Sequence, residues 1–278
     1  IKHYFEAEGR EKLDENQVYK LTSCVEGWPA VVKLAAIGLQ NASSPGEVKQ
    51  VLTGEYQLIS QFLLKNLLLD LGSELLEFVH QTSHLNDLRA DLCNVVCNIK
   101  DSEVKMQALV ERGLLNEHRY FERVYRYPRF ISAYLKRNFE TTLGERAGDL
   151  RKRAADWYIE TSNPSESLYH ALFLSDINCA LDVMVRYAKQ LVTAGETALL
   201  RRFFSRLPEG TMDQIPLLWY VYCWTLIITQ KFSEAEVAVK SLKKSLSPEN
   251  KQSPDGYLLP QDAEVKVLDY RIRQALDS

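Results

Sequence analysis

The chain has 278 residues, of which 46% are apolar and 26% charged, and its formal net charge is −3. This length allows roughly two domains with sizeable cores. The slightly negative charge gives no electrostatic case for binding nucleic acid or an anionic membrane.

The five cysteines are odd in number and scattered (Cys24, Cys93, Cys97, Cys179 and Cys223), which predicts reduced thiols and a cytoplasmic protein. No signal peptide is visible, and the longest apolar run, from Ile215 to Thr229, is too short to span a bilayer, so we expect no membrane association. Because the first residue is Ile1 rather than Met, we expect the chain to begin inside a longer protein.

The pattern is almost wholly helical, and we predict a mostly α fold in three segments. Residues 1–50 form a helical segment that ends in a polar loop around Pro45 and Gly46. Within it, "GWPAVVKLAAIGL" predicts a buried helix with Pro29 in its first turn, where the missing N–H costs nothing.

Residues 51–144 predict a winged helix. The run "YQLISQFLLKNLLLDL" is a strongly amphipathic helix, and Ser73 is the expected N-cap of the next helix. Two shorter helices follow, the second ended by Gly113. The stretch "LLNEHRYFERVYRYPRF" fits no helical period and predicts two short strands joined by a tight turn near residues 118–121.

Residues 145–278 predict paired helices of the tetratricopeptide type. Two stretches share one design, in which large residues on a first helix precede a short break and small alanines on a second. The breaks lie between Ala171 and Ala180 and near Phe232. A polar loop then leads into a final helix, "AEVKVLDYRIRQAL", with one apolar stripe formed by Val265, Val267, Leu268, Ile272 and Leu276.

Taken in order, these stretches resemble one family. "LTSCVEGWPAVVKLAAIGL", "ELLEFVHQTSHLNDLRADLCNVV", "VERGLLNEHRYFERVYRYPRFISAYLKRNF" and "LRKRAADWYIETSNPSESLYHAL" are similar to the middle of MalT-like LuxR-type regulators, which belong to the STAND NTPases. The resemblance implies the helical segment after a nucleotide-binding core, a winged-helix arm and the start of a superhelical sensor domain.

The resemblance also implies nucleotide contacts, made only in the full-length protein. Pro29 would touch the adenine of ATP or ADP, with Gly27 allowing close approach and Trp28 flanking it; alternatively, Trp28 and Pro29 only fix a helix to the core. Tyr127 occupies the position where the family tends to carry a phosphate-sensing His. Tyr can donate a hydrogen bond but is neutral at pH 7, which departs from the family pattern.

Two parts of the family are missing from the sequence. It contains no G-x-x-x-x-G-K-[ST] loop and no basic C-terminal helix-turn-helix. We therefore expect no cofactor in this chain, no enzymatic activity of its own and no direct DNA binding. Its expected partners are the missing NTPase domain, an effector or regulatory protein at the helical repeats, and a possible second copy.

Other constellations favour structural roles. His80 and His84 share a helix face, but no third ligand is evident, so no metal site is predicted. Cys93 and Cys97 are expected to be buried thiols, and the basic run Arg151–Arg153 a solvated helix face.

The aromatic cluster Trp219, Tyr220, Tyr222 and Trp224 is the candidate effector or partner site. Neighbours on a helix point about 100° apart, so these side chains cannot share one face. We therefore expect a signal-transduction segment of an ATP-dependent transcriptional regulator. A stand-alone helical-repeat scaffold and a winged-helix DNA-binding protein are the alternatives.

Overall fold

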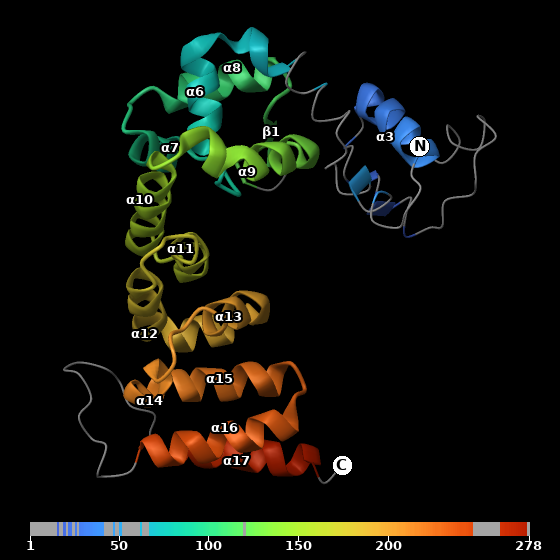
Figure 1. The fold of residues 1–278 in the computed structure, drawn as a ribbon. Coiled ribbons are helices and arrows are strands. Elements are labelled where there is room, and N and C mark those ends of the chain that lie inside the picture. Colours follow the sequence, from blue (N-terminus) through green and yellow to red (C-terminus); the bar gives the residue numbers. More distant parts are fainter. Residues whose placement is uncertain are drawn as a thin grey trace. The chain divides into compact units, whose positions relative to one another are not determined.

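The computed structural model describes residues 28–41, 67–118, 121–246 and 262–276, with scattered single positions before residue 67. The chain divides into two compact units, residues 1–150 and 151–278. The expected mostly α fold with a short two-stranded sheet is confirmed (Figure 1).

The first unit contains α3 (Pro29–Asn41) and a winged-helix cluster. The cluster comprises the 3-10 turn η2 (Leu69–Leu71), α6 (Gly72–Thr82), α7 (Ala90–Cys97), α8 (Ser102–Glu111), β1 (Asn116–Glu117), β2 (Tyr125–Arg126) and α9 (Arg129–Leu143). α6 packs against both α7 and α9, and α7 packs against α8. α10 (Arg146–Glu160) begins in this unit and continues into the second.

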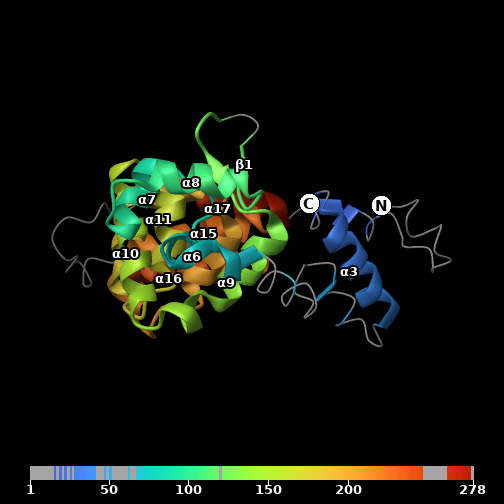
Figure 2. The same ribbon diagram turned by 90° about the horizontal axis from the view of Figure 1, so that it is seen from above.

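The strand pair is antiparallel, with Asn116 opposite Arg126 and Glu117 opposite Tyr125, and it lies at the edge of the helical cluster (Figure 2). Leu88 extends it by one bridge, since its N–H donates to the Tyr125 carbonyl at 2.7 Å and its carbonyl accepts from the Tyr125 N–H at 2.9 Å. The loop between the strands spans residues 118–124, so the predicted tight turn at 118–121 is too short.

Two details of the helix ends test the sequence predictions. Gly113 adopts φ +71° just after α8, and its N–H donates to the Val110 carbonyl, as expected for a helix-ending glycine. The prediction that Ser73 caps α6 is wrong, because the helix begins at Gly72 and its N-cap is Leu71. Most of the amphipathic run from Tyr56 to Leu71 lies outside the described residues.

The second unit is a series of packed helices. α11 (Pro164–Ala171) packs on α12 (Asn178–Thr193), and α15 (Pro216–Ile228) packs on α16 (Phe232–Ser245). α13 (Thr197–Phe204) and the short α14 (Thr211–Gln214) both contact α15, and α17 (Asp262–Leu276) packs on α16 (Figure 1). The predicted helix pairs and their breaks are therefore present, and Ala180, Ala235 and Ala238 are buried as expected.

The final helix buries fewer residues than its sequence indicates. Val265, Leu268 and Ile272 join a core cluster with α15 and α16. Val267 and Leu276, expected in the same stripe, are 48% and 45% exposed because they lie off the face that meets α16. None of the described helices combines the length and apolar character needed to cross a lipid bilayer.

Candidate functional site

The start of α3 is attached to the winged-helix cluster by Trp28. Its half-buried ring meets the fully buried ring of Phe130 edge-on, with centroids 5.3 Å apart. A Cβ on Gly113 would lie 3.6 Å from Trp28 Cζ2, so the absence of a side chain at Gly113 lets the indole approach. Trp28 therefore bridges the entry to α3 and the first turn of α9.

Glu26 adds a polar attachment to the same cluster. Its carboxylate accepts from Arg126 Nη2 at 3.3 Å and from Asn116 Nδ2 at 3.4 Å, and Arg129 Nε lies 3.9 Å away. The Glu26 side chain is only 13% exposed, and its backbone adopts φ +45°, which is rare for a residue with a side chain. We call Glu26, Trp28, Arg126 and Phe130 the α3 clamp.

The other residues with an implied nucleotide role lie in different surroundings. Pro29 is the first residue of α3 and is exposed, whereas Gly27 lies outside the described residues. Tyr127 is 4% exposed, and its hydroxyl lies 2.8 Å from Thr82 Oγ1. Since Thr82 donates its one proton to the Phe78 carbonyl, Tyr127 is the donor. The nucleotide roles themselves stay predictions.

The aromatic cluster of α15 divides between two faces, as the helical geometry requires. Trp219 and Tyr222 line a groove shared with α13. Tyr220 and Trp224 meet edge-on at 6.4 Å on another face, and the Arg271 guanidinium of α17 lies 5.6 Å from the Trp224 ring. Trp224 is thus a packing surface for α17, while Trp219 and Tyr222 are placed toward an open space.

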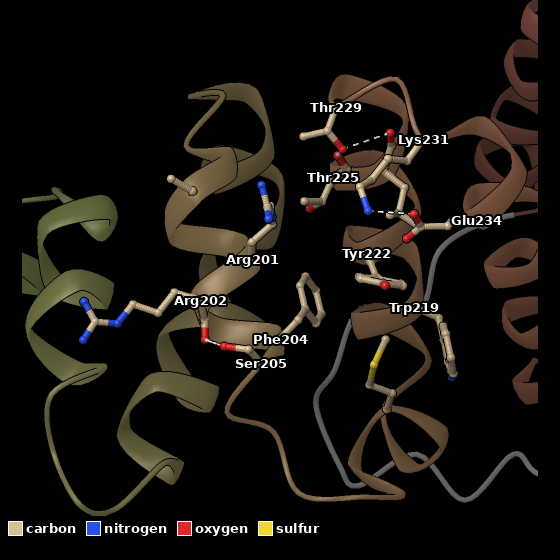
Figure 3. A pocket seen from close by; sticks show the side chains of 13 residues that line it. Arg201, Arg202, Phe204, Ser205, Trp219, Tyr222, Thr225, Thr229, Lys231 and Glu234 are labelled. Atoms are coloured by element: carbon tan, nitrogen blue, oxygen red, sulfur yellow. Dashed lines mark hydrogen bonds and ion pairs between the residues drawn. The ribbon is translucent and has the colours of Figure 1, made fainter. Parts of the chain in front are cut away.

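The groove has a volume of about 740 Å³ and lies between α13, α15 and the start of α16 (Figure 3). Its apolar part is aromatic, since Phe204 meets Tyr222 edge-on at 4.9 Å and Tyr222 meets Trp219 at 6.1 Å. Trp219 is held in place because its Nε1–H donates to Asp213 Oδ1 at 3.1 Å.

The other part of the groove is polar. Thr225 and Thr229 bond back to carbonyls of their own helix, and Lys231 Nζ pairs with Glu234 Oε1 at 2.6 Å. Arg201 and Arg202 both line the groove, but the Arg202 guanidinium is directed to the Phe173 ring, 4.0 Å away (Figure 3). Sequence reasoning missed Arg201 and Phe204; the Arg-Arg-Phe-Phe run beside an amphipathic stripe is the signal that contained them.

Comparison with known proteins agrees with this architecture. Residues 64–147 match the family model of the MalT winged helix domain. The chain is similar to MalT regulators along most of its length. The HTH-type transcriptional regulator MalT of Klebsiella pneumoniae is 21% identical over 276 residues, and that of Serratia proteamaculans is 21% identical over 249 residues. These alignments cover 96% and 88% of this chain.

A kinase shares the same segment. The serine/threonine-protein kinase PknK of Mycobacterium tuberculosis is 24% identical over 258 residues, which cover 92% of this chain. The chain spans only 23% of that kinase and 30% of the Klebsiella regulator, so it corresponds to part of each relative.

Two histidines and a buried cysteine of the first unit carry side chains that can ligate metals. His84 is buried against the Phe139 ring at 4.6 Å, and His80 is half-buried, which lowers its pKa. Within the described ranges, no group of three His, Cys, Asp or Glu side chains is arranged to hold a metal ion. Burial raises the pKa of the Cys93 thiol well above its ordinary value, so this cysteine remains protonated.

The expectation that Arg151–Arg153 form a solvated face is wrong for Arg151. That residue is 6% exposed, and its guanidinium lies 4.0 Å from the Phe173 ring. The ring of Phe173 is therefore contacted by two arginines, Arg151 and Arg202, because a guanidinium can be buried against an aromatic face.

Proposed function

We propose that this chain is a regulatory segment of an ATP-dependent LuxR-type transcriptional regulator. It couples the nucleotide state of an NTPase domain, through the winged helix, to ligand sensing in the helical repeats. The observation that carries the proposal is the MalT winged-helix match over residues 64–147 together with similarity to MalT regulators along nearly the whole chain.

The α3 clamp supplies a physical route for this coupling. By the resemblance, Pro29 at the start of α3 touches the adenine, and the neighbouring Trp28 packs on Phe130 of α9. Any nucleotide-dependent shift of the α3 start therefore acts directly on the winged helix. Such a shift biases an equilibrium only by the difference in contacts between its two states, and we propose that the contacts of the clamp are the ones that differ.

The charge of α8 supports an intramolecular role for the winged helix over DNA reading. Lys105 is the basic residue within this helix, and its ammonium contacts the carboxylates of both Glu74 and Asp101. A groove-reading helix needs positive charge free to meet phosphates. Salt-dependent micromolar binding of arbitrary duplex DNA would favour the DNA-binding alternative.

The similarity to PknK supports a second candidate function, in which the same segment regulates a protein kinase. Under both candidates the chain is regulatory rather than catalytic. The coding sequence on either side separates them, because a P-loop upstream and a helix-turn-helix downstream specify the transcriptional regulator. A kinase domain upstream specifies the second candidate.

The coupling is tested by hydrogen exchange of the complete protein in ATP and in ADP. We expect amides at the start of α9 to exchange differently in the two nucleotides, and we expect Glu26→Ala with Trp28→Leu to reduce that difference. Glu103→Ala is the matched control, because Glu103 is an exposed carboxylate on α8 of the same unit. Identical exchange in ATP and ADP would refute the coupling.

A further inference from the structure

We infer that the groove between α13 and α15 binds an organic anion with an apolar ring, such as an aromatic carboxylate. This inference rests on the proposed function, because it names the chemical class of the effector that the helical repeats sense. The groove lies entirely within the second unit, and its two parts differ in chemistry.

The aromatic part of the groove suits a flat apolar body. Phe204, Tyr222 and Trp219 lie in succession from α13 to α15, each edge-on to the next (Figure 3). All three are only half-buried, so parts of their rings remain open to a ligand. A ring placed among them gains edge-to-face contacts and removes apolar surface from water.

The polar part of the groove has a surplus of positive charge. Lys231 and Glu234 neutralise each other across 2.6 Å, and Arg202 is directed at Phe173. Among the described residues, Arg201 has neither a carboxylate partner nor a side-chain hydrogen bond, and it lines the groove as an exposed side chain (Figure 3). Its guanidinium therefore offers paired N–H donors to an anionic group, the geometry that a carboxylate matches best.

The test uses two probes with the same ring, naphthalene-2-carboxylate and the uncharged naphthalene-2-carboxamide. Each is titrated calorimetrically into the chain at about 0.15 M salt, where long-range charge effects are screened. We expect the carboxylate to bind about tenfold more tightly than the amide, as one charge-assisted hydrogen-bonded pair permits. Equal affinities, or no carboxylate binding at millimolar concentration, would overturn the inference.

Three variants assign the binding to this groove. Arg201→Gln is expected to abolish the preference for the carboxylate, and Tyr222→Leu to weaken both probes. Arg202→Gln is the matched control, since it removes the same charge from the next position of α13, and it should change affinity less than twofold. An equal loss in Arg201→Gln and Arg202→Gln would show a diffuse charge effect and refute the site.

This outcome is separable from the proposed function. If the groove binds the carboxylate through Arg201 but the complete protein shows no nucleotide-dependent exchange at α9, the coupling fails and the ligand class stands. If coupling is present and both probes bind equally, the regulator stands and the ligand class is wrong.

Discussion

The hydrogen bond between Tyr127 and Thr82 provides a quantitative test of how the winged helix is stabilised. Replacing Tyr127 with Phe removes one buried hydroxyl and keeps the ring. Thr82 Oγ1 then loses the 2.8 Å bond that it accepts but retains the bond that it donates to the Phe78 carbonyl. The variant therefore loses one buried hydrogen bond and leaves its acceptor partly satisfied. We expect the free energy of unfolding to fall by about 1–2 kcal/mol.

The effect should not depend on pH. Burial raises the pKa of Tyr127 well above its usual range, so the hydroxyl remains protonated wherever the protein is folded. Urea unfolding followed by circular dichroism measures the loss, and the melting temperature should fall by about 2–4 °C for each kcal/mol.

A double-mutant cycle with Thr82→Val isolates the pair, and we expect a coupling energy of about 1 kcal/mol. Tyr125→Phe is the matched control, because Tyr125 is also buried but makes no side-chain hydrogen bond among the described residues. A Tyr127→Phe protein as stable as the parent, or a coupling near zero, would refute the reasoning. A lost nucleotide response at unchanged stability would instead favour the sensing role that the family resemblance implies.

Two further predictions concern other parts of the molecule. Burial lowers the pKa of His80 below its ordinary 6.5, against the smaller opposing charge of Glu77, so the unfolded chain binds the proton more tightly. The contribution of His80 to stability is thus complete above about pH 6.5 and is lost as the pH drops toward the pKa of the folded state. His80→Gln should flatten the dependence of unfolding free energy on pH, measured by urea titration. An unchanged pH dependence would contradict the role given to His80. Leu268 of α17 is fully buried in a core cluster with α15 and α16, so Leu268→Ala should lower the free energy of unfolding by about 2–5 kcal/mol. Val267 is half-exposed, so Val267→Ala should lower it by less than about 0.5 kcal/mol. Equal losses of both variants on urea unfolding would show that α17 is not docked as described.

Much of the winged helix was predictable because its signals are local. The helix-ending glycine Gly113 and the strand character of the aromatic stretch around Tyr125 depend on backbone preference and on side chains close in sequence. The prediction of a cap at Ser73 failed for the complementary reason. A serine can cap only where the helix begins, and the preceding packed turn, Leu69–Leu71, moves that start to Gly72.

The candidate sites were predictable only in part. The sequence indicated that Trp219, Tyr220, Tyr222 and Trp224 cannot share one face, because a helix turns about 100° per residue. The Arg-Arg-Phe-Phe run marked Arg201 and Phe204 as unusual, but the sequence did not indicate that they would form the opposite wall, since they lie about twenty positions away on another helix. The two neighbouring arginines also differ for a tertiary reason. The guanidinium of Arg202 contacts the ring of Phe173, which is distant in the sequence, whereas Arg201 makes no such contact within the described part of the chain.

The sequence by itself determined the mostly helical class, the paired helices with small alanines and the family resemblance, because these follow from periodicity and from the order of motifs. Only the tertiary structure decided that Glu26 and Trp28 contact the winged helix and that the Tyr127 hydroxyl is hydrogen-bonded to Thr82 inside it. It also decided that the aromatic cluster divides between a groove and the contact with α17. Such outcomes are set by contacts between residues far apart in the chain, and no local preference encodes which distant side chain completes a pair.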